Sequence, residues 1–302
     1  MNMDFSRRVA IVTGAGGGLG RQYALALAAR GAKVVVNDLG GTVDGSGFSP
    51  AAAQMVVDEI RSAGGDAIAS GASVTDFDAM QTMVAEAVDK WGRVDILINN
   101  AGVLRDSSFA KMALEDFRLV MDVHLMGAVN CTKAVWDIMR HNSYGRIVMT
   151  TSSSGLYGNF GQSGYSAAKM ALVGLMQTLS IEGSKYNIHV NSIAPTAFTR
   201  MTDGLMPDME KLLTPESVVP AMLVLAHETA PTRTILCAGA GTFEAAHITM
   251  TDGMHIGADV DAPERLAGLL AQVMDRTGST VPLAAIEQGR NEIEKASAAI
   301  RR

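Results

Sequence analysis

The chain has 302 residues, a formal net charge of −6 and 48% hydrophobic residues. Acidic and basic residues are interspersed, so the chain has no basic surface typical of nucleic-acid binding, and we expect no nucleic-acid partner. The two cysteines, Cys131 and Cys237, are too few for a disulfide scaffold and lie in no metal-binding motif, so we expect no metal. No stretch approaches the length of a bilayer-spanning helix, so we expect no membrane partner.

A glycine-rich turn joins the first predicted strand to the first predicted helix. The apolar run Val9–Val12 predicts a strand, and the alanine- and leucine-rich run Arg21–Arg30 predicts a helix. Between them, Thr13–Gly20 reads TGAGGGLG, a dinucleotide fingerprint whose backbone amides and helix N-terminus hold a pyrophosphate. An ordinary loop is the alternative. The residues of this turn that we expect to bind the cofactor are Gly14, Gly16, Gly18, Leu19 and Gly20.

An acidic residue ends the second predicted strand, Lys33–Asp38. A carboxylate at this position of the fingerprint accepts hydrogen bonds from the adenosine ribose and repels the 2′-phosphate of NADP. Asp38 therefore predicts NAD as the cofactor. The alternative is that Asp38 only caps a loop.

Continuous apolar runs predict strands that are buried on both faces. Val34–Val36, Ile96–Ile98 and Ile147–Met149 are of this kind, and such strands are typical of parallel sheets covered by helices. We predict an α/β fold, a Rossmann-type doubly wound parallel sheet with helices on both faces. The length allows two domains, but no linker rich in proline or serine divides the chain, so we predict one catalytic domain, residues 1–257.

Three side chains suggest proton-transfer chemistry. Ser152 follows the predicted strand at Ile147–Met149, and ligands of open α/β sheets bind at that edge. Tyr165 and Lys169 are four residues apart, so on a helix they share one face. A free tyrosine has a pKa near ~10, and a cation beside it favours the phenolate. The alternative is a tyrosine packed on the core with a solvated lysine one turn on.

Together these residues resemble the short-chain dehydrogenase/reductase family over residues 8–257. The resemblance also includes the segment NNAG at Asn99–Gly102. It implies that Tyr165 is the acid/base, that Lys169 lowers the pKa of Tyr165 and holds the nicotinamide ribose, and that Ser152 binds the substrate oxygen. Asn99 would support the central strand. The further cofactor contacts that it implies are Ser73, Val74, Asn100, Ala101, Gly102, Pro195 and the pair Tyr165 and Lys169.

Three positions depart from the family pattern. His124 replaces an asparagine that completes a proton relay, so it is either a catalytic relay member or a buried histidine that hydrogen-bonds a helix bend. Ser73 replaces an aspartate that contacts adenine, and Thr196 replaces a glycine after Pro195. These departures put details of the site in doubt and leave the expected reaction unchanged.

Longer strings resemble the (3R)-hydroxyacyl-CoA dehydrogenases of peroxisomal multifunctional enzymes, namely Asn37–Gly41, Gly102–Ala110 and Tyr157–Gln162. This resemblance implies oxidation of a (3R)-3-hydroxyacyl-CoA to a 3-oxoacyl-CoA. A hydroxysteroid, either a 17β-hydroxysteroid or a CoA ester of a steroid side chain, is the alternative substrate. A nucleotide sensor or scaffold on the same fold is the alternative that is not an enzyme, and the presence of Ser152, Tyr165 and Lys169 argues against it. A hydrolase is disfavoured because no GxSxG surrounds Ser152.

The last part of the chain carries expectations about architecture and location. The family's loop over nicotinamide and substrate corresponds to Thr196–Leu213, whose methionines would suit an acyl chain or a steroid. Residues 258–302 predict a helical C-terminal extension without catalytic residues. The helix after Tyr165 resembles the family's subunit-packing helix, so we expect a homodimer or homotetramer. Ala299–Arg302 is not an SKL-type peroxisomal signal, and we expect a free-standing, cytoplasmic enzyme.

Overall fold

The computed structural model describes residues 3–47, 49, 51–198 and 211–301. The chain divides into two compact units, Met1–Ala245 and Ala246–Arg302. The division lies upstream of residue 257, where the sequence predicts the end of the catalytic domain. We describe each unit separately.

An eight-stranded sheet forms the centre of the first unit, in the order β3-β2-β1-β4-β5-β6-β7-β8. The neighbouring strands from β3 to β7 pair in parallel. This order places β1 between β2 and β4, where the chain reverses the direction in which it adds strands. The strands are β1 (Val9–Thr13), β2 (Lys33–Asn37), β3 (Asp66–Ser70), β4 (Ile96–Asn99), β5 (Gly145–Thr150), β6 (Ile188–Thr196), β7 (Ile235–Gly239) and β8 (Thr242–Ala246).

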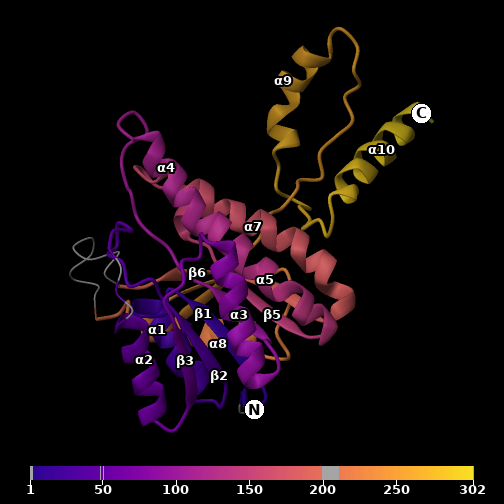
Figure 1. Ribbon diagram of the computed structural model, residues 1–302. Coiled ribbons are helices and arrows are strands. Elements are labelled where there is room, and N and C mark those ends of the chain that lie inside the picture. The colour runs from indigo at the N-terminus through magenta and orange to yellow at the C-terminus, as the bar shows by residue number, and fades with distance from the viewer. Residues whose placement is uncertain (1–2, 48, 50, 199–210, 302) are drawn as a thin grey trace. The chain divides into compact units, whose positions relative to one another are not determined.

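Helices cover both faces of this sheet, so the predicted Rossmann-type fold is confirmed (Figure 1). Helix α1 packs beside α2 and α8, and α3 packs beside α5. The helices are α1 (Gly18–Ala28), α2 (Ala51–Ser62), α3 (Phe77–Trp91), α4 (Leu114–Met121), α5 (Gly127–His141), α6 (Ser153–Tyr157), α7 (Ser163–Gly183) and α8 (Val219–Ala226), with the short turns η1 (Asp122–Met126), η2 (Ser184–Tyr186) and η4 (Pro215–Val218).

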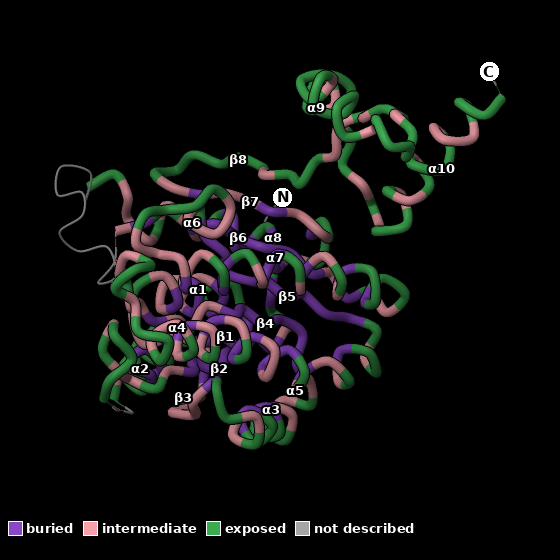
Figure 2. The backbone as a smooth tube through the Cα atoms, turned by 90° about the horizontal axis from the view of Figure 1, so that it is seen from above, coloured by how far each residue is buried: buried purple, intermediate pink, exposed green. Residues whose placement is uncertain are grey.

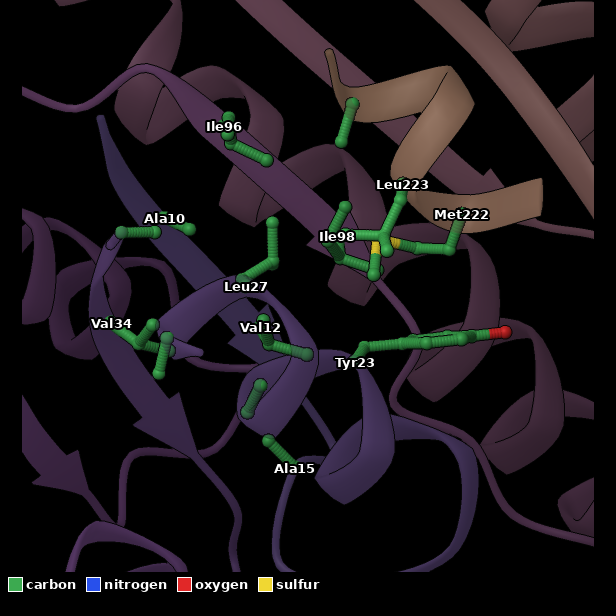
Figure 3. Close-up of a cluster of buried hydrophobic side chains, with 14 of the residues drawn as sticks. Ala10, Val12, Ala15, Tyr23, Leu27, Val34, Ile96, Ile98, Met222 and Leu223 are labelled. Carbon is green, nitrogen blue, oxygen red and sulfur yellow. The ribbon is translucent and has the colours of Figure 1, made fainter. Parts of the chain in front are cut away.

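Side chains of the central strands point alternately to the two faces of the sheet, and each face is covered by its own helices. Val12 and Ile98 point to the face covered by α1 and α8, where they lie among Tyr23, Leu27 and Met222 (Figure 3). Successive side chains of a strand point to opposite faces, so the neighbouring positions serve the other helix layer. This explains why these strands are continuously apolar and why they form the buried centre of the unit in Figure 2.

Helices α4 and α5 form one continuous helical run that is interrupted by η1, one turn of π-helix. The extra residue of a π-turn widens the helix locally, and such turns are frequent at functional sites. His124 lies in this turn. His124 therefore lies where the helical hydrogen-bond pattern changes between α4 and α5.

The second unit contains α9 (Ala262–Val273) and α10 (Ile286–Ile300), so the segment that the sequence predicts to be helical does contain helices. Met250 and Thr280 form an antiparallel bridge with two hydrogen bonds of 2.9 Å. Lys295 Nζ lies 2.8 Å from Asp252 Oδ1. Throughout the described part of the chain, no helix is both long and apolar enough to cross a membrane.

A buried carboxylate joins β1 to β4 at the start of both strands. Asp95 is fully buried, and its Oδ2 accepts a hydrogen bond of 2.9 Å from the Val9 amide. Arg93 Nε lies 2.8 Å from the same oxygen, and Arg8 approaches Oδ1 at 3.7 Å. A buried charge is tolerated when it is paired and hydrogen-bonded, as here.

We expect Asp95→Ala to lower the free energy of unfolding by about 2 kcal/mol, because it leaves the buried Val9 amide without an acceptor. Chemical denaturation measures this loss. Asp137→Ala is the control, since it removes a carboxylate that is 76% exposed and pairs with Arg140 across one helical turn. Its cost should be below about 0.5 kcal/mol. Equal losses in the two variants would contradict the role given to Asp95.

Candidate active site

A cleft of about 220 Å³ opens at the carboxyl ends of the strands β1 to β4. This is the edge at which ligands bind in open α/β sheets, beside the point where the strand order reverses. The cleft is lined by most of the residues that the sequence predicts for the cofactor: Gly14, Gly18, Leu19, Asp38, Ser73, Val74, Asn100, Ala101 and Gly102.

The glycine-rich turn has a backbone that other residues would strain. Gly14 and Gly18 have φ values of 62° and 51°, in the left-handed region. A Cβ on Gly14 would lie 2.8 Å from the Cα of Ala101. The turn leads directly into α1, whose first amides have no partner within the helix. A glycine cradle at a helix N-terminus fits the pyrophosphate of a dinucleotide.

Asn100 and Thr13 join this turn to the end of β4. Asn100 Nδ2 donates to the Thr13 carbonyl at 2.9 Å and to the Gly14 carbonyl at 3.1 Å. Thr13 Oγ1 accepts from the amides of Asn100 and Ala101 at 3.0 and 3.1 Å. Asn100 therefore contributes to the cofactor site by holding the turn. Thr13 does the same, and the sequence analysis did not single it out.

Asp38 both borders the cleft and braces two loops. Its Oδ2 accepts from the Gly16 amide at 2.7 Å, and its Oδ1 accepts from the Gly40 amide at 2.6 Å. The loop-capping role that the sequence left open is thus present. The carboxylate also lines the cleft.

Five of the predicted cofactor residues do not line the cleft, namely Gly16, Gly20, Pro195, Tyr165 and Lys169. A Cβ on Gly20 would collide with the carbonyl of Gly14, and a Cβ on Gly16 would lie 2.9 Å from the Asp38 carboxyl, so these glycines permit close packing behind the turn. Pro195 lies in β6 and pairs with Ala238 of β7. Asn99 is buried and donates to Thr132 Oγ1 at 3.1 Å, which agrees with support of the central strand.

Ser152, Tyr165 and Lys169 come together at the end of β5. Ser152 precedes α6, and its Oγ accepts from the Ser154 amide at 3.2 Å. Tyr165 and Lys169 lie on one face of α7, with Lys169 Nζ 5.5 Å from the centroid of the Tyr165 ring. The Ser152 side chain also acts on the Tyr165 hydroxyl, as a hydrogen-bonding group that lowers its pKa. The arrangement places a hydroxyl donor, a phenol and a cation around one small volume.

The pKa of Tyr165 is raised, whereas the sequence led us to expect a lowered one. Burial raises the pKa of Tyr165, while the hydrogen bond with Ser152 lowers it and the charge of Asp106 raises it. The first cause is the largest, because removing the phenol from water disfavours its charged form.

Lys169 is 3% exposed and donates from Nζ to the Thr150 carbonyl at 2.6 Å. Burial lowers the pKa of this ammonium to about 7. Thr151 Oγ1 donates to the Lys169 carbonyl at 2.7 Å and fixes α7 against the end of β5. The alternative of a solvated lysine is therefore wrong.

His124 is buried beside the reacting groups and faces the backbone of Val103. Its Nε2 lies 2.8 Å from the Val103 carbonyl and 3.1 Å from the Val103 amide, while its Nδ1 has no hydrogen-bond partner among the described residues. The ring packs edge-on against Tyr165 at 5.2 Å between centroids. Burial and the charge of Lys169 lower the pKa of His124 well below its usual value. Gly102 makes room for this ring, since a Cβ there would collide with it.

The sequence analysis missed part of the site. The insertion after Asp38 lines the cleft with Gly41, Thr42, Val43 and Gly45, and the Leu104 amide donates to the Val43 carbonyl at 3.0 Å. The glycine-rich composition of this insertion was the available signal.

Most of the expected substrate loop, with Met201, Leu205, Met206 and Met209, lies outside the described residues. Within the described ranges, no three His, Cys, Asp or Glu side chains gather as a metal site requires.

Comparisons with known proteins agree with this geometry. A family model described as short chain dehydrogenase matches residues 8–211. The chain is 56% identical over 228 residues to the peroxisomal hydratase-dehydrogenase-epimerase of Saccharomyces cerevisiae, covering 75% of this chain and 25% of that protein. The chain thus spans about a quarter of the length of this curated relative.

Two solved structures are similar to this chain. Full-length peroxisomal multifunctional enzyme type 2 from Drosophila melanogaster matches with a TM-score of 0.80 and 38% identity, covering 97% of this chain and 50% of that chain. A 7α-hydroxysteroid dehydrogenase, solved with NADH and 7-oxo glycochenodeoxycholic acid, matches with a TM-score of 0.72 and 30% identity, covering 80% and 96%.

The buried Lys169 predicts a pH dependence of stability. Its pKa is about 7 in the folded protein, against about 10.4 for an unfolded lysine. Between these values the unfolded chain binds one more proton, so the free energy of unfolding rises with pH, by up to about 1.4 kcal/mol per pH unit.

Lys169→Met removes this titration, so its curve of unfolding free energy against pH should be flatter than that of the wild type between about pH 7 and 9. Urea denaturation without added cofactor measures both curves. Parallel curves would mean that Lys169 keeps an ordinary pKa in the folded protein.

Proposed function

Because the chain belongs to the short-chain dehydrogenase/reductase family and is an oxidoreductase, we propose that it oxidises a secondary alcohol to a ketone with NAD. We propose (3R)-3-hydroxyacyl-CoA as the substrate and 3-oxoacyl-CoA as the product. The observation that carries the proposal is the cluster of Ser152, Tyr165 and Lys169 beside a glycine-lined cleft.

In this proposal Tyr165 accepts the hydroxyl proton of the substrate as the general base. Ser152 donates a hydrogen bond to the substrate oxygen and holds it at the phenol. Lys169 stabilises the phenolate, and the phenolate in turn favours the charged form of the lysine. The bound NAD supplies the hydride acceptor. Gly14, Gly18 and Leu19 would hold its pyrophosphate, and Asp38 its adenosine ribose.

We propose that His124 positions groups and does not exchange protons with the substrate. Its Nε2 is engaged with Val103, and a lowered pKa keeps the ring neutral at physiological pH. The ring supports both Tyr165, through its edge-on contact, and the segment after Gly102. The catalytic relay role considered from the sequence is the less supported of its two roles.

The substrate proposal rests on relatives and on local strings together. The yeast relative is named a hydratase-dehydrogenase-epimerase, and the Drosophila structure is a multifunctional enzyme type 2. A hydroxysteroid is the second candidate, favoured by the likeness to the 7α-hydroxysteroid dehydrogenase that was solved with a bile-acid product.

A homodimer or homotetramer stays a prediction. On α7, Ala168 and Leu172 are buried within the subunit, while Met170, Gly174 and Ile181 are exposed. The cytoplasmic location also stays a prediction. The yeast relative differs in this respect, because its name describes it as peroxisomal.

We expect Asp38→Asn to reduce the preference for NAD over NADP at least about ten-fold, or about 1.4 kcal/mol. The amide keeps the shape of the carboxylate and removes the charge that repels a 2′-phosphate. Dissociation constants for both cofactors measure the change. Asp58→Asn, on the exposed side of α2, is the control. An unchanged ratio would leave Asp38 with only its loop-bracing role.

The substrate is tested by kcat/KM for both enantiomers of a medium-chain 3-hydroxyacyl-CoA and for a 17β-hydroxysteroid. We expect NAD reduction with the (3R) thioester and little with the (3S) form, because fixed Ser152 and Tyr165 accept one geometry. Tyr165→Phe is the control and should lower kcat at least about 10²-fold while NAD still binds. A preference for (3S), or a steroid far ahead of both thioesters, would overturn the acyl-CoA proposal.

A further inference from the structure

A hydrogen-bonded string of side chains leads away from Ser152 and is used neither by the proposed chemistry nor by the cofactor cleft. Its centre is Gln162, a half-buried residue that immediately precedes α7 and lies three residues before Tyr165. The string joins segments that are 56 residues apart in sequence.

The orientation of the Gln162 amide is determined by its partners. Its Nε2 donates to Asp106 Oδ2 at 2.6 Å, and its Oε1 accepts from Ser154 Oγ at 2.7 Å and from Asn159 Nδ2 at 2.9 Å. A carboxylate can only accept hydrogen bonds, so the nitrogen must face Asp106. Rotating the amide by half a turn would lose this donor and place a second nitrogen against Asn159.

The string continues to the reacting groups through Ser154. The Ser154 hydroxyl is committed to Gln162, and the Ser154 amide donates to Ser152 Oγ at 3.2 Å. Ser152 therefore accepts a hydrogen bond from behind, and its own hydrogen is left to donate forward, to Tyr165 or to a substrate oxygen. The position of Ser154 thus decides where the Ser152 hydroxyl points.

The other end of the string holds the segment after Gly102. Besides the bond from Gln162 to Asp106, the Ser107 amide donates to the Gly161 carbonyl at 2.9 Å. Asp106 is close enough to act on the reacting tyrosine, since its charge raises the pKa of Tyr165. One residue, Gln162, therefore contacts both the serine segment and an acidic residue that influences the phenol.

We propose that Gln162 is a positioning residue of the dehydrogenase site, whose amide is oriented by Asp106 and directs the Ser152 hydroxyl through Ser154. This inference rests on the proposed function for its effect on turnover. Its effect on Tyr165 can be measured without turnover, because the Ser152 side chain lowers the pKa of Tyr165 in the absence of substrate.

Gln162→Leu keeps the size of the side chain and removes all three hydrogen bonds. We expect kcat to fall roughly ten- to 10²-fold, as a misplaced reacting group would cause, while the dissociation constant for NAD stays at the wild-type value. NMR titration of labelled tyrosine in the protein without cofactor should give a higher pKa for Tyr165. Asn159→Ala is the matched control, because it removes only the exposed partner of the same oxygen.

Exchanging the amide of Gln162 and the carboxylate of Asp106 tests the orientation of the Gln162 amide. Recovery of kcat in the exchanged pair would also show that the single variants are not simply misfolded. Gln162→Glu places two carboxylates together and should lower kcat as Gln162→Leu does. In the double variant Asp106→Asn with Gln162→Glu, the new amide can donate to the new carboxylate, which still accepts from Ser154, so most of kcat should return. Asp106→Asn alone keeps the string and should lower the pKa of Tyr165, because a negative charge is removed.

The outcomes separate the two proposals. If the wild type oxidises no secondary alcohol with NAD, the proposed function fails, and the Tyr165 titration still decides the role of Gln162. If Gln162→Leu leaves both kcat and the Tyr165 pKa unchanged, Gln162 only braces two loops and the inference is overturned. Failure of the double variant to recover either quantity would overturn the orienting role of Asp106.

Discussion

The close approach of the turn after β1 to the turn after β4 is the constraint on which the site depends. The backbone at Gly14 leaves no space for a Cβ against Ala101, and Thr13 and Asn100 join the two turns by four hydrogen bonds. This contact can form only because β1 and β4 are adjacent and parallel, so that both end at the same edge. The cleft, the start of α1 and the segment after Gly102 all follow from it.

A second constraint is the burial of charge next to the reacting phenol. Lys169 is enclosed, its ammonium donates to the Thr150 carbonyl, and the cost of desolvation appears as a lowered pKa. Tyr165 is subject to the same cost in the opposite direction. Each group therefore favours its neutral form until a charged partner forms beside it. Shifted pKa values of this kind are typical of sites where side chains gain and lose protons.

The polar groups around the site have different tasks although they lie close together. His124 and Asn100 hold backbone segments in place, and Asp38 combines loop bracing with a charge that faces the cleft. Ser152 and Tyr165 are turned toward one another. In a functional site, a few atoms react, and a larger set of side chains fixes the geometry of those atoms.

The sequence by itself determined the elements of the fold and the motifs on them. Continuous apolar strands predicted the parallel sheet, the glycines at Thr13–Gly20 predicted the cofactor turn, and the four-residue spacing predicted that Tyr165 and Lys169 share a face. These are local properties, which depend on backbone periodicity and on the conformational freedom of glycine. The tertiary structure alone decided that Lys169 is buried, that His124 faces Val103, and that Gln162 joins Asp106 to Ser154. Those contacts join residues that are distant in sequence, and their geometry depends on the register and packing of several elements at once, which no local pattern encodes.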